Sequence, residues 1–437
     1  MEQIRIDSLS SDFLGTGIAP NGKKISYPYT LPGDLISVEM YKRKTRSTKY
    51  RLVEFLEKSE RAPIPCQFYG ECGGCAGQHI PYDDQCKIKF EPIQQLFSQL
   101  GVQFQTINSD QIFNYRSRMD FSVFPGPTIG LRARGNFRRV IDIDHCFIHS
   151  DWANKELANV RNLLNEFPQL PWDRNSERGG LKYITIRKAR FTEDCMTIFT
   201  FTEGFQFDSD FANFKERTLE LCIANHIIFC YNRVKSEVSA MGRSEILKGS
   251  DVYHEIVLGR DFLIPFDSFF QPNPSGFLPI LEFIQSHLPE NRNCLIDLFC
   301  GNGFFSILFG TSFSKIKCYE LTPSSIEIAK NALHRAFPEK EILTQVVNLF
   351  QDASLMECPS DSVLILDPPR AGAGGKVNVW IRENGPRDIF YVSCNPYSQR
   401  EDLKFYQTHY DVVASLLIDP YPHTPHCESV LHLRRKI

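Results

Sequence analysis

Two short motifs in the C-terminal third of the chain each place a chemically useful side chain directly after an apolar strand. Cys394 follows the strand-like run DIFYVS and precedes Asn-Pro, which ends the strand. Asp367 follows SVLIL and precedes two prolines, which stiffen the backbone behind it. Since the carboxyl ends of neighbouring parallel strands meet in one crevice, we predict that the Cys394 thiol and the Asp367 carboxylate share a site. A rigid turn without chemistry is the simpler alternative for Asp367.

A glycine-containing loop, DLFCGNG at residues 297–303, predicts a site for an adenosine-containing cofactor. Its two glycines let the backbone approach a ligand closely, and Glu320, after the next strand, can accept hydrogen bonds from two ribose hydroxyls. Ser306 stands where a dinucleotide fingerprint has glycine, which disfavours a pyrophosphate ligand. S-adenosylmethionine carries no phosphate and tolerates the acidic loop. Asn348, after the third strand, could reach the adenine or simply form a turn.

A thiol beside a methyl donor indicates methylation of uracil at C5. That carbon is a poor nucleophile, but addition of a thiolate to C6 turns the ring into an enolate that can attack a methylsulfonium. A free cysteine has a pKa of about 8.5, so the site must favour the thiolate. The C5 proton must then leave, and Glu428, at the start of the strand ESVLHL, is a candidate base or else an exposed strand end. Gln271, in the motif FFQPN, offers an amide that could bridge cofactor and base.

A cysteine-rich loop near the N-terminus predicts a metal site. Cys66, Cys72 and Cys75 lie within ten residues among glycines, and the fourth ligand would be Cys86 or the distant Cys146. Zinc sites more typically show paired C-x-x-C knuckles, so an iron–sulfur cluster is favoured. A purely structural group of thiols is the alternative.

The elements that must position these residues fall into three regions. Residues 1–60 contain four or five short strands separated by glycine and proline, which predicts a small closed β-barrel. Residues from 114 to about 265 are mainly strand-like, with a helix near Asn154–Phe167. From Phe277 onward strands and helices alternate, which indicates a doubly wound parallel sheet with helices on both faces. A further helix is predicted around Ile88–Leu100.

Two local clusters of cations are candidate nucleic-acid surfaces. Six lysines and arginines between residues 42 and 51 have no acid among them, and a second arginine cluster spans residues 116–139 with Asp120 as its acid. Each is either a phosphate-binding surface or a solvated face. We hypothesise that Arg132 and Arg134 contact RNA.

Composition sets limits on the class of protein. The 437 residues carry a net charge of −3, with 42% hydrophobic and 23% charged residues, which excludes wholesale disorder and a global cationic field. The N-terminus lacks the apolar core of a signal peptide, and no apolar run could span a bilayer. We therefore expect a cytoplasmic protein, without a membrane partner, in which the 14 cysteines form no disulfide framework. We expect a monomer.

In combination, these motifs resemble the RNA uracil-C5 methyltransferases that use S-adenosylmethionine. The similarity covers nearly the whole chain and is carried by the CysX5CysX2Cys loop with Cys146, FFQPNP, DLFCGNG, DPPRAGAGG, VSCNP and PHTPHCES. Within that family the chain is most similar to the iron–sulfur branch that acts on uridines of 23S ribosomal RNA. The resemblance implies an α/β and β multidomain fold: a TRAM/OB-like barrel at 1–60, a central α+β iron–sulfur and RNA-binding domain at 61–268, and a Rossmann-like methyltransferase domain at 269–437. Helix 81–101 is expected to pack on the last of these.

The same resemblance implies roles for individual residues. It makes Cys394 the nucleophile and Glu428 the base for the C5 proton. It implies S-adenosylmethionine and a [4Fe-4S] cluster as cofactors, with contacts to the first from Gln271, Phe299, Phe304, Glu320, Asn348 and Asp367, and to the second from Cys66, Cys72, Cys75 and Cys146. Phe304 departs from the asparagine expected after the glycine turn. The cluster is assigned a role in folding or RNA positioning.

Three functions are weighed against one another. The first is formation of 5-methyluridine in structured RNA, 23S ribosomal RNA first and transfer RNA as the alternative. The second takes Asp367-Pro-Pro as an amino-methylating motif, which leaves Cys394 and Glu428 unused. The third is a non-catalytic RNA-binding iron–sulfur scaffold, against which the intact cleft motifs argue.

Overall fold

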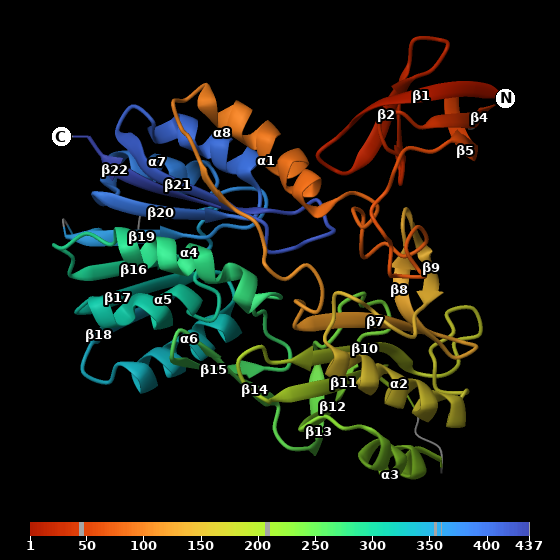
Figure 1. The fold of residues 1–437 in the computed structure, drawn as a ribbon. Helices are drawn as coiled ribbons and strands as arrows, with labels where there is room; N and C mark the ends of the chain where they lie inside the picture. Colours follow the sequence, from red (N-terminus) through yellow and green to blue (C-terminus); the bar gives the residue numbers. More distant parts are fainter. Residues whose placement is uncertain (43–47, 206–209, 354–355, 360, 437) are drawn as a thin grey trace.

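The computed structural model describes residues 1–42, 48–205, 210–353, 356–359 and 361–436. Three larger β-sheets and one two-stranded ribbon organise these residues. Figure 1 shows the N-terminal strands in red, the central sheet in yellow and green, and the C-terminal sheet in teal and blue as three bodies. No helix among the described residues is long and apolar enough to cross a membrane.

The N-terminal sheet is antiparallel, with strand order β3-β2-β1-β4-β5. Its strands are β1 (Glu2–Leu9), β2 (Leu14–Ile18), β3 (Lys24–Pro28), β4 (Leu35–Lys42) and β5 (Thr48–Glu57). Alternate side chains from β1, β3, β4 and β5 meet in one small apolar core, so the sheet curls as a barrel does.

The predicted barrel closure needs correction. Within the described residues no ladder joins the edge strands β3 and β5. Side chains such as Tyr27 and Leu52 meet in the core instead. The curled shape of the sheet is therefore held by side-chain packing and not by backbone hydrogen bonds between its edge strands. Residues 43–47 of the predicted cationic run lie outside the described residues.

The central sheet has the order β13-β12-β11-β10-β7-β8-β9, in which β11 and β12 are parallel and the other neighbours antiparallel. Its strands are β7 (Arg118–Phe124), β8 (Thr128–Ala133), β9 (Asn136–Asp142), β10 (Leu181–Lys188), β11 (Cys195–Thr202), β12 (His226–Asn232) and β13 (Arg243–Lys248). The hairpin β14 (Val252–Val257) and β15 (Arg260–Pro265) follows.

Two helices pack on the central sheet. α2 (Asp151–Glu166) begins three residues before the predicted Asn154, because the Ser150 hydroxyl accepts a hydrogen bond from the Ala153 N–H and so caps the helix there. α3 (Asp210–Leu221) is missing from the sequence prediction. Its apolar face is short, and the sequence on either side has the pattern of strands, so the pattern does not indicate a helix there.

The C-terminal sheet has the order β18-β17-β16-β19-β20-β22-β21-β6. Its strands are β16 (Cys294–Leu298), β17 (Lys315–Glu320), β18 (Glu341–Val346), β19 (Ser362–Leu366), β20 (Asp388–Ser393), β21 (Tyr410–Ile418), β22 (Glu428–Arg435) and β6 (Gln105–Ile107). Its helices are α4 (Pro274–His287), α5 (Phe304–Phe309) with a short 3-10 turn (Gly310–Ser312), α6 (Pro323–Ala336), α7 (Gly375–Asn384) and α8 (Pro396–Tyr406). α8 starts three residues before the predicted Gln399, because Pro396 suits the first helical position.

The prediction of a wholly parallel sheet is corrected at the last strand. β22 runs antiparallel to both β20 and β21. The physical reason is the short link 419–427, because a parallel pair would need a crossover of a dozen or more residues.

An N-terminal segment completes the C-terminal sheet. β6 pairs in parallel with β21, and α1 (Tyr82–Ser98) lies beside α8 (Figure 1). Phe90, Ile93 and Phe97 of α1 are buried in the same core as Leu417 and Tyr406. Helix α1 therefore belongs structurally with the C-terminal sheet. It begins at Tyr82, within one residue of the start expected for helix 81–101 and six residues before the Ile88 indicated by the apolar pattern alone. The domain limits at residues 60 and 268 stay predictions.

Candidate active site

A cleft of about 600 Å³ opens at the carboxyl ends of the parallel strands of the C-terminal sheet. The eight cleft residues predicted from sequence all line it: Gln271, Phe299, Phe304, Glu320, Asn348, Asp367, Cys394 and Glu428. The topology explains this convergence, because β16, β17, β19 and β20 run in the same direction and end at the same edge.

The glycine loop after β16 is shaped for close approach of a ligand. Gly301 and Gly303 both have positive φ, and a Cβ added at Gly303 would lie 3.2 Å from the Ala329 Cβ. Gly301 faces open space, and its N–H donates to Glu320 Oε2 at 3.3 Å. The Thr322 N–H donates to Glu320 Oε1 at 3.0 Å. Glu320 is therefore held at the mouth of the loop, where it can accept ribose hydroxyls.

Two carboxyl groups lie at the base of the cofactor side of the cleft. Asp297 is buried and accepts hydrogen bonds from the Ser306 N–H at 3.1 Å and hydroxyl at 2.6 Å. Burial raises its pKa to about 7. Burial also raises the pKa of Asp367 to about 7, and the nearby Asp297 carboxyl adds to this shift. Ser306, which departs from the dinucleotide pattern, thus anchors Asp297 beneath the loop.

Aromatic side chains form one wall of the cleft. The Phe304 ring packs against Phe262 and Phe270 at centroid distances of 5.5 and 5.6 Å, and Phe299 packs against Phe350. Phe304 therefore contributes an apolar surface where the family resemblance leads one to expect a polar asparagine. Such a wall suits the adenine ring and the hydrocarbon part of S-adenosylmethionine.

The FFQPN segment is fixed from both sides of the cleft. The Asn302 amide donates to the Phe269 carbonyl at 3.0 Å, and the Ser117 N–H donates to the Pro272 carbonyl at 2.7 Å. Gln271 lies buried between these anchors. Asn348 lines the cleft and accepts the Phe350 N–H at 3.2 Å, as a turn residue does, and its contact with the adenine stays a prediction.

Cys394, directly after β20, and Glu428, the first residue of the neighbouring β22, interact electrostatically. Burial raises the pKa of the Cys394 thiol, the Glu428 and Asp367 carboxylates raise it further, and the Arg370 guanidinium lowers it. Burial likewise raises the pKa of Glu428 well above its usual range, an effect that Asp367 increases and Arg370 opposes. The Asn395 amide donates to the Arg370 carbonyl at 2.8 Å, which ties the two motif loops together.

These shifts predict the pH dependence of any reaction that needs the Cys394 thiolate. A raised pKa means that the thiolate forms only as pH rises, so the rate should increase toward alkaline pH. Arg370→Ala removes the charge that lowers this pKa, and the rising limb of the pH–rate profile should move to higher pH. Arg370→Lys keeps the positive charge and should leave the rising limb of the pH–rate profile closer to its wild-type position. Single-turnover methyl transfer across the neutral to alkaline range measures this, and an unmoved limb in Arg370→Ala would contradict the assignment.

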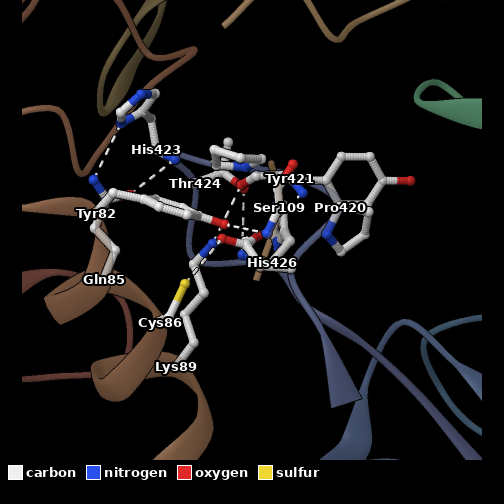
Figure 2. Close-up of polar contacts among 12 residues, drawn as sticks. Tyr82, Gln85, Cys86, Lys89, Ser109, Pro420, Tyr421, His423, Thr424 and His426 are labelled. Atoms are coloured by element: carbon white, nitrogen blue, oxygen red, sulfur yellow. Dashed lines mark hydrogen bonds and ion pairs between the residues drawn. The ribbon is translucent and has the colours of Figure 1, made fainter. Parts of the chain in front are cut away.

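The loop 419–427, which leads into Glu428, is held by the N-terminal half of the chain. Lys89 of α1 forms a buried ion pair with Asp419 at 2.7 Å, and Gln85 accepts the His423 N–H at 2.9 Å (Figure 2). The Tyr115 hydroxyl donates to the Pro422 carbonyl at 2.9 Å. Helix α1 thus fixes the position of the loop that precedes the candidate base.

Several cleft residues escape the sequence prediction. Arg116, Arg370, Tyr421, Thr424 and His426 also line the cleft. Arg116 comes from the central region, just before β7, and no local sequence pattern separates it from its neighbouring arginines. Tyr421, Thr424 and His426 lie in the PYPHTPHC run, where their clustering before Glu428 is the available signal.

The four cysteines predicted as cluster ligands converge. Cys66, Cys72, Cys75 and Cys146 line one small cavity, whereas the alternative Cys86 lies on α1 near Asp419. Burial raises the pKa of all four thiols, that of Cys146 to about 11, and neighbouring thiols raise it further in Cys72, Cys75 and Cys146.

Within the described residues no group of three or more His, Cys, Asp or Glu side chains is arranged to hold a metal ion. The predicted iron–sulfur cluster therefore stays a prediction.

Arginines of the cluster at 116–139 form ion pairs that its local sequence does not indicate. Arg132 pairs with Glu237 at 3.3 Å, and Arg139 pairs with Glu71. The partners lie far away in sequence, which is why a local count of acids misses them. Arg134 stands over the Tyr29 ring at 5.3 Å, so it packs against the N-terminal sheet.

Comparison with known proteins gives the family. Residues 255–436 match the tRNA (Uracil-5-)-methyltransferase family model. An uncharacterized RNA methyltransferase of Leptospira interrogans is 43% identical over 99% of this chain and 97% of its own length. The tRNA (uracil(54)-C(5))-methyltransferase of Pyrococcus horikoshii is 30% identical over 96% and 97%. The crystal structure of the Pyrococcus abyssi tRNA (uracil-54, C5)-methyltransferase with S-adenosyl-L-homocysteine superposes with a TM-score of 0.79, at 26% identity over 99% of this chain and 100% of that chain.

The doubly wound sheet with its cleft defines an S-adenosylmethionine-dependent methyltransferase. More specifically, the chain belongs to the RNA uracil-5-methyltransferase family, and it is an RNA (uracil-5-)-methyltransferase.

Proposed function

We propose that the enzyme forms 5-methyluridine through a covalent bond between Cys394 and C6 of the target uracil. The observation that carries this proposal is the placement of the Cys394 thiol and the Glu428 carboxylate in one cleft with the cofactor-loop residues. An amino-methylating site would leave both side chains without a task.

The reaction follows from these positions. The Cys394 thiolate adds to C6, and the electron pair moves to C5 and the adjoining carbonyl. Bound S-adenosylmethionine supplies a methyl group on a sulfonium, which C5 attacks. Glu428 then removes the C5 proton, the electron pair re-forms the C5–C6 double bond, and the Cys394 sulfur leaves as thiolate. Arg116, a cation of the same cleft, is positioned to interact with a uracil carbonyl or the adjoining phosphate.

The cofactor side of the cleft gives a separate prediction. Glu320→Ala should weaken binding of S-adenosylmethionine at least about tenfold, since hydrogen bonds to a charged acceptor contribute about 1.5–3 kcal/mol each. Isothermal titration calorimetry measures this. Glu327→Ala, on the exposed face of α6, is the matched control and should bind normally. Equal affinities in both variants would remove Glu320 from the cofactor site.

For the RNA, two substrates have support of different kinds. The Pyrococcus horikoshii and Pyrococcus abyssi relatives, which match over nearly the full chain, are named for uracil 54 of transfer RNA, which favours transfer RNA. The motif resemblance to the iron–sulfur branch favours 23S ribosomal RNA. Mapping of 5-methyluridine in both RNAs, from cells with and without the gene, distinguishes them. Loss from neither RNA would refute both.

We further propose that Cys66, Cys72, Cys75 and Cys146 hold a [4Fe-4S] cluster. The supporting observation is their shared cavity. The N–H groups of Ala76 and Gly77, directly after Cys75, donate to the His423 carbonyl. An ordered cysteine loop therefore helps to hold the 419–427 loop, which leads into Glu428. We propose a structural and RNA-positioning role for the cluster. Separately, the family resemblance supports an RNA-binding role for the curled N-terminal sheet as a TRAM-like module.

The cluster proposal predicts the iron content of protein purified without oxygen. We expect about four irons and four sulfides per chain. Cys146→Ser should lose them, whereas Cys86→Ser, the discarded fourth ligand, should keep them. Iron retained in Cys146→Ser and lost in Cys86→Ser would reverse the assignment.

A further inference from the structure

A second cavity, of about 680 Å³, lies in the central sheet and has no part in the chemistry above. We call it the Trp172 pocket. It is lined by two kinds of side chain that together bind nucleotides, namely aromatic rings and cations. The rings are Phe124, Phe137, Trp172 and Tyr183, and the cations are Arg132, Arg138, Arg174 and Lys182.

Two of the four aromatic side chains, Phe137 and Trp172, lie outside the apolar cores of the protein. Phe137 is 82% exposed, and Trp172 is only half-buried. A large exposed phenylalanine beside a hollow is unfavourable in water unless something covers it. Bases of single-stranded nucleic acid stack on such rings regardless of their sequence.

The cations are held in place around the rings. The Arg132 guanidinium stands 5.4 Å from the Phe124 ring centre. Glu237 accepts hydrogen bonds from Arg132, Arg174 and the Tyr183 hydroxyl. It therefore holds these three side chains in position in the wall of the Trp172 pocket.

Positive charge remains in excess around the pocket. The Lys182 ammonium donates to two backbone carbonyls, those of Arg233 and Ser236. Arg138 is exposed, and Asp173 is the carboxylate of the lining itself. Four cations therefore face two carboxylates, Glu237 and Asp173, which suits a phosphate next to a stacked base.

The pocket lies along the same strands as the catalytic cleft. Arg116, just before β7, lines the cleft, and Phe124, at the end of β7, lines the Trp172 pocket. Eight residues of extended chain correspond to roughly 27 Å. A folded RNA can extend over that distance, so one RNA can reach both sites.

From this geometry we propose that the Trp172 pocket binds an unstacked nucleotide of the RNA substrate, at a site whose Phe124 lies roughly 27 Å along the extended chain from Arg116 in the cleft. The proposal rests on the proposed function, since it assigns the pocket to the same RNA. The pocket would stack the base on Phe137 and Trp172 and hold the phosphate with Arg138 and Arg174. It would thereby select RNAs that present an unpaired nucleotide at that distance.

Binding of a fluorescent oligouridylate of about twelve nucleotides tests the pocket directly. Trp172→Ala and Phe137→Ala should each weaken binding about fivefold or more, the range of one lost stacking contact. Phe137 is so exposed that its loss will not unfold the protein. Phe191→Ala removes an exposed ring elsewhere in the central region and should change nothing. Arg138→Ala should reduce the slope of log affinity against log salt by about one.

Two results would overturn the proposal. One is wild-type affinity of both aromatic variants for the oligonucleotide. The other is binding of uridine monophosphate at the pocket as tightly as the oligonucleotide, which would indicate a small-molecule site.

Methylation assays separate this proposal from the proposed function. In RNA that the wild type methylates, Phe137→Ala should raise the KM for RNA and leave the KM for S-adenosylmethionine unchanged. If no RNA is methylated but the oligouridylate affinities still differ, the reaction is wrong and the pocket stands. If methylation proceeds, and wild type and Phe137→Ala have equal KM for RNA and equal affinity for the oligouridylate, the pocket proposal is wrong and the proposed reaction stands.

Discussion

Cys394→Ala is expected to abolish methyl transfer, with a loss of at least about 10⁴-fold, the scale seen when a covalent nucleophile is removed. Without the sulfur, C5 of uracil has no route to an enolate and cannot attack the methyl group. Binding of S-adenosylmethionine should persist, because Cys394 is not among the residues predicted to contact the cofactor. Transfer of tritiated methyl groups into RNA measures the loss, and calorimetry measures the retained binding.

The control for this variant is another half-buried thiol. Cys358→Ala removes a cysteine outside the cleft lining and should keep full activity. Turnover by Cys394→Ala at the rate of Cys358→Ala would exclude a covalent mechanism.

Glu428→Gln is expected to trap the enzyme on its own product. Glutamine fills the same volume but cannot accept the C5 proton, so methyl transfer proceeds while elimination of Cys394 stops. Turnover should fall about 10²–10⁴-fold, the range for loss of a general base. Methylated RNA should remain covalently attached to the protein and be visible as a slower band on a denaturing gel.

The double variant tests which sulfur is involved. Cys394→Ala combined with Glu428→Gln should form no attached RNA. Release of free methylated RNA by Glu428→Gln at the normal rate would assign the proton to another base in the cleft.

The cleft could be predicted from sequence because its geometry follows from local rules. Glu320, Asp367 and Cys394 each lie at or directly after the end of an apolar strand, and parallel strands end at one edge. The chemistry of a thiol, a carboxylate and a methyl donor then limits the reaction. The four cysteines of the second site converge for a similar reason, since three of them share one short loop.

What escapes prediction depends on contacts between distant parts of the chain. Arg132 pairs with Glu237, which lies 105 residues away, so an acid-free local run did not mean a free cation. Lys89 and Gln85 hold the 419–427 loop across more than 300 residues. The antiparallel β22 and the added β6 likewise depend on the length of one link and on an edge left open by β21.

The most direct test of the mechanism uses RNA that carries 5-fluorouridine at the methylation site. After methyl transfer, C5 of that uracil bears fluorine in place of hydrogen, so Glu428 has no proton to remove and the sulfur cannot leave. The account predicts a stable, methylated RNA adduct that mass spectrometry of the digested protein locates on Cys394. Tight binding of this RNA without an adduct, or an adduct on any other residue, would contradict it.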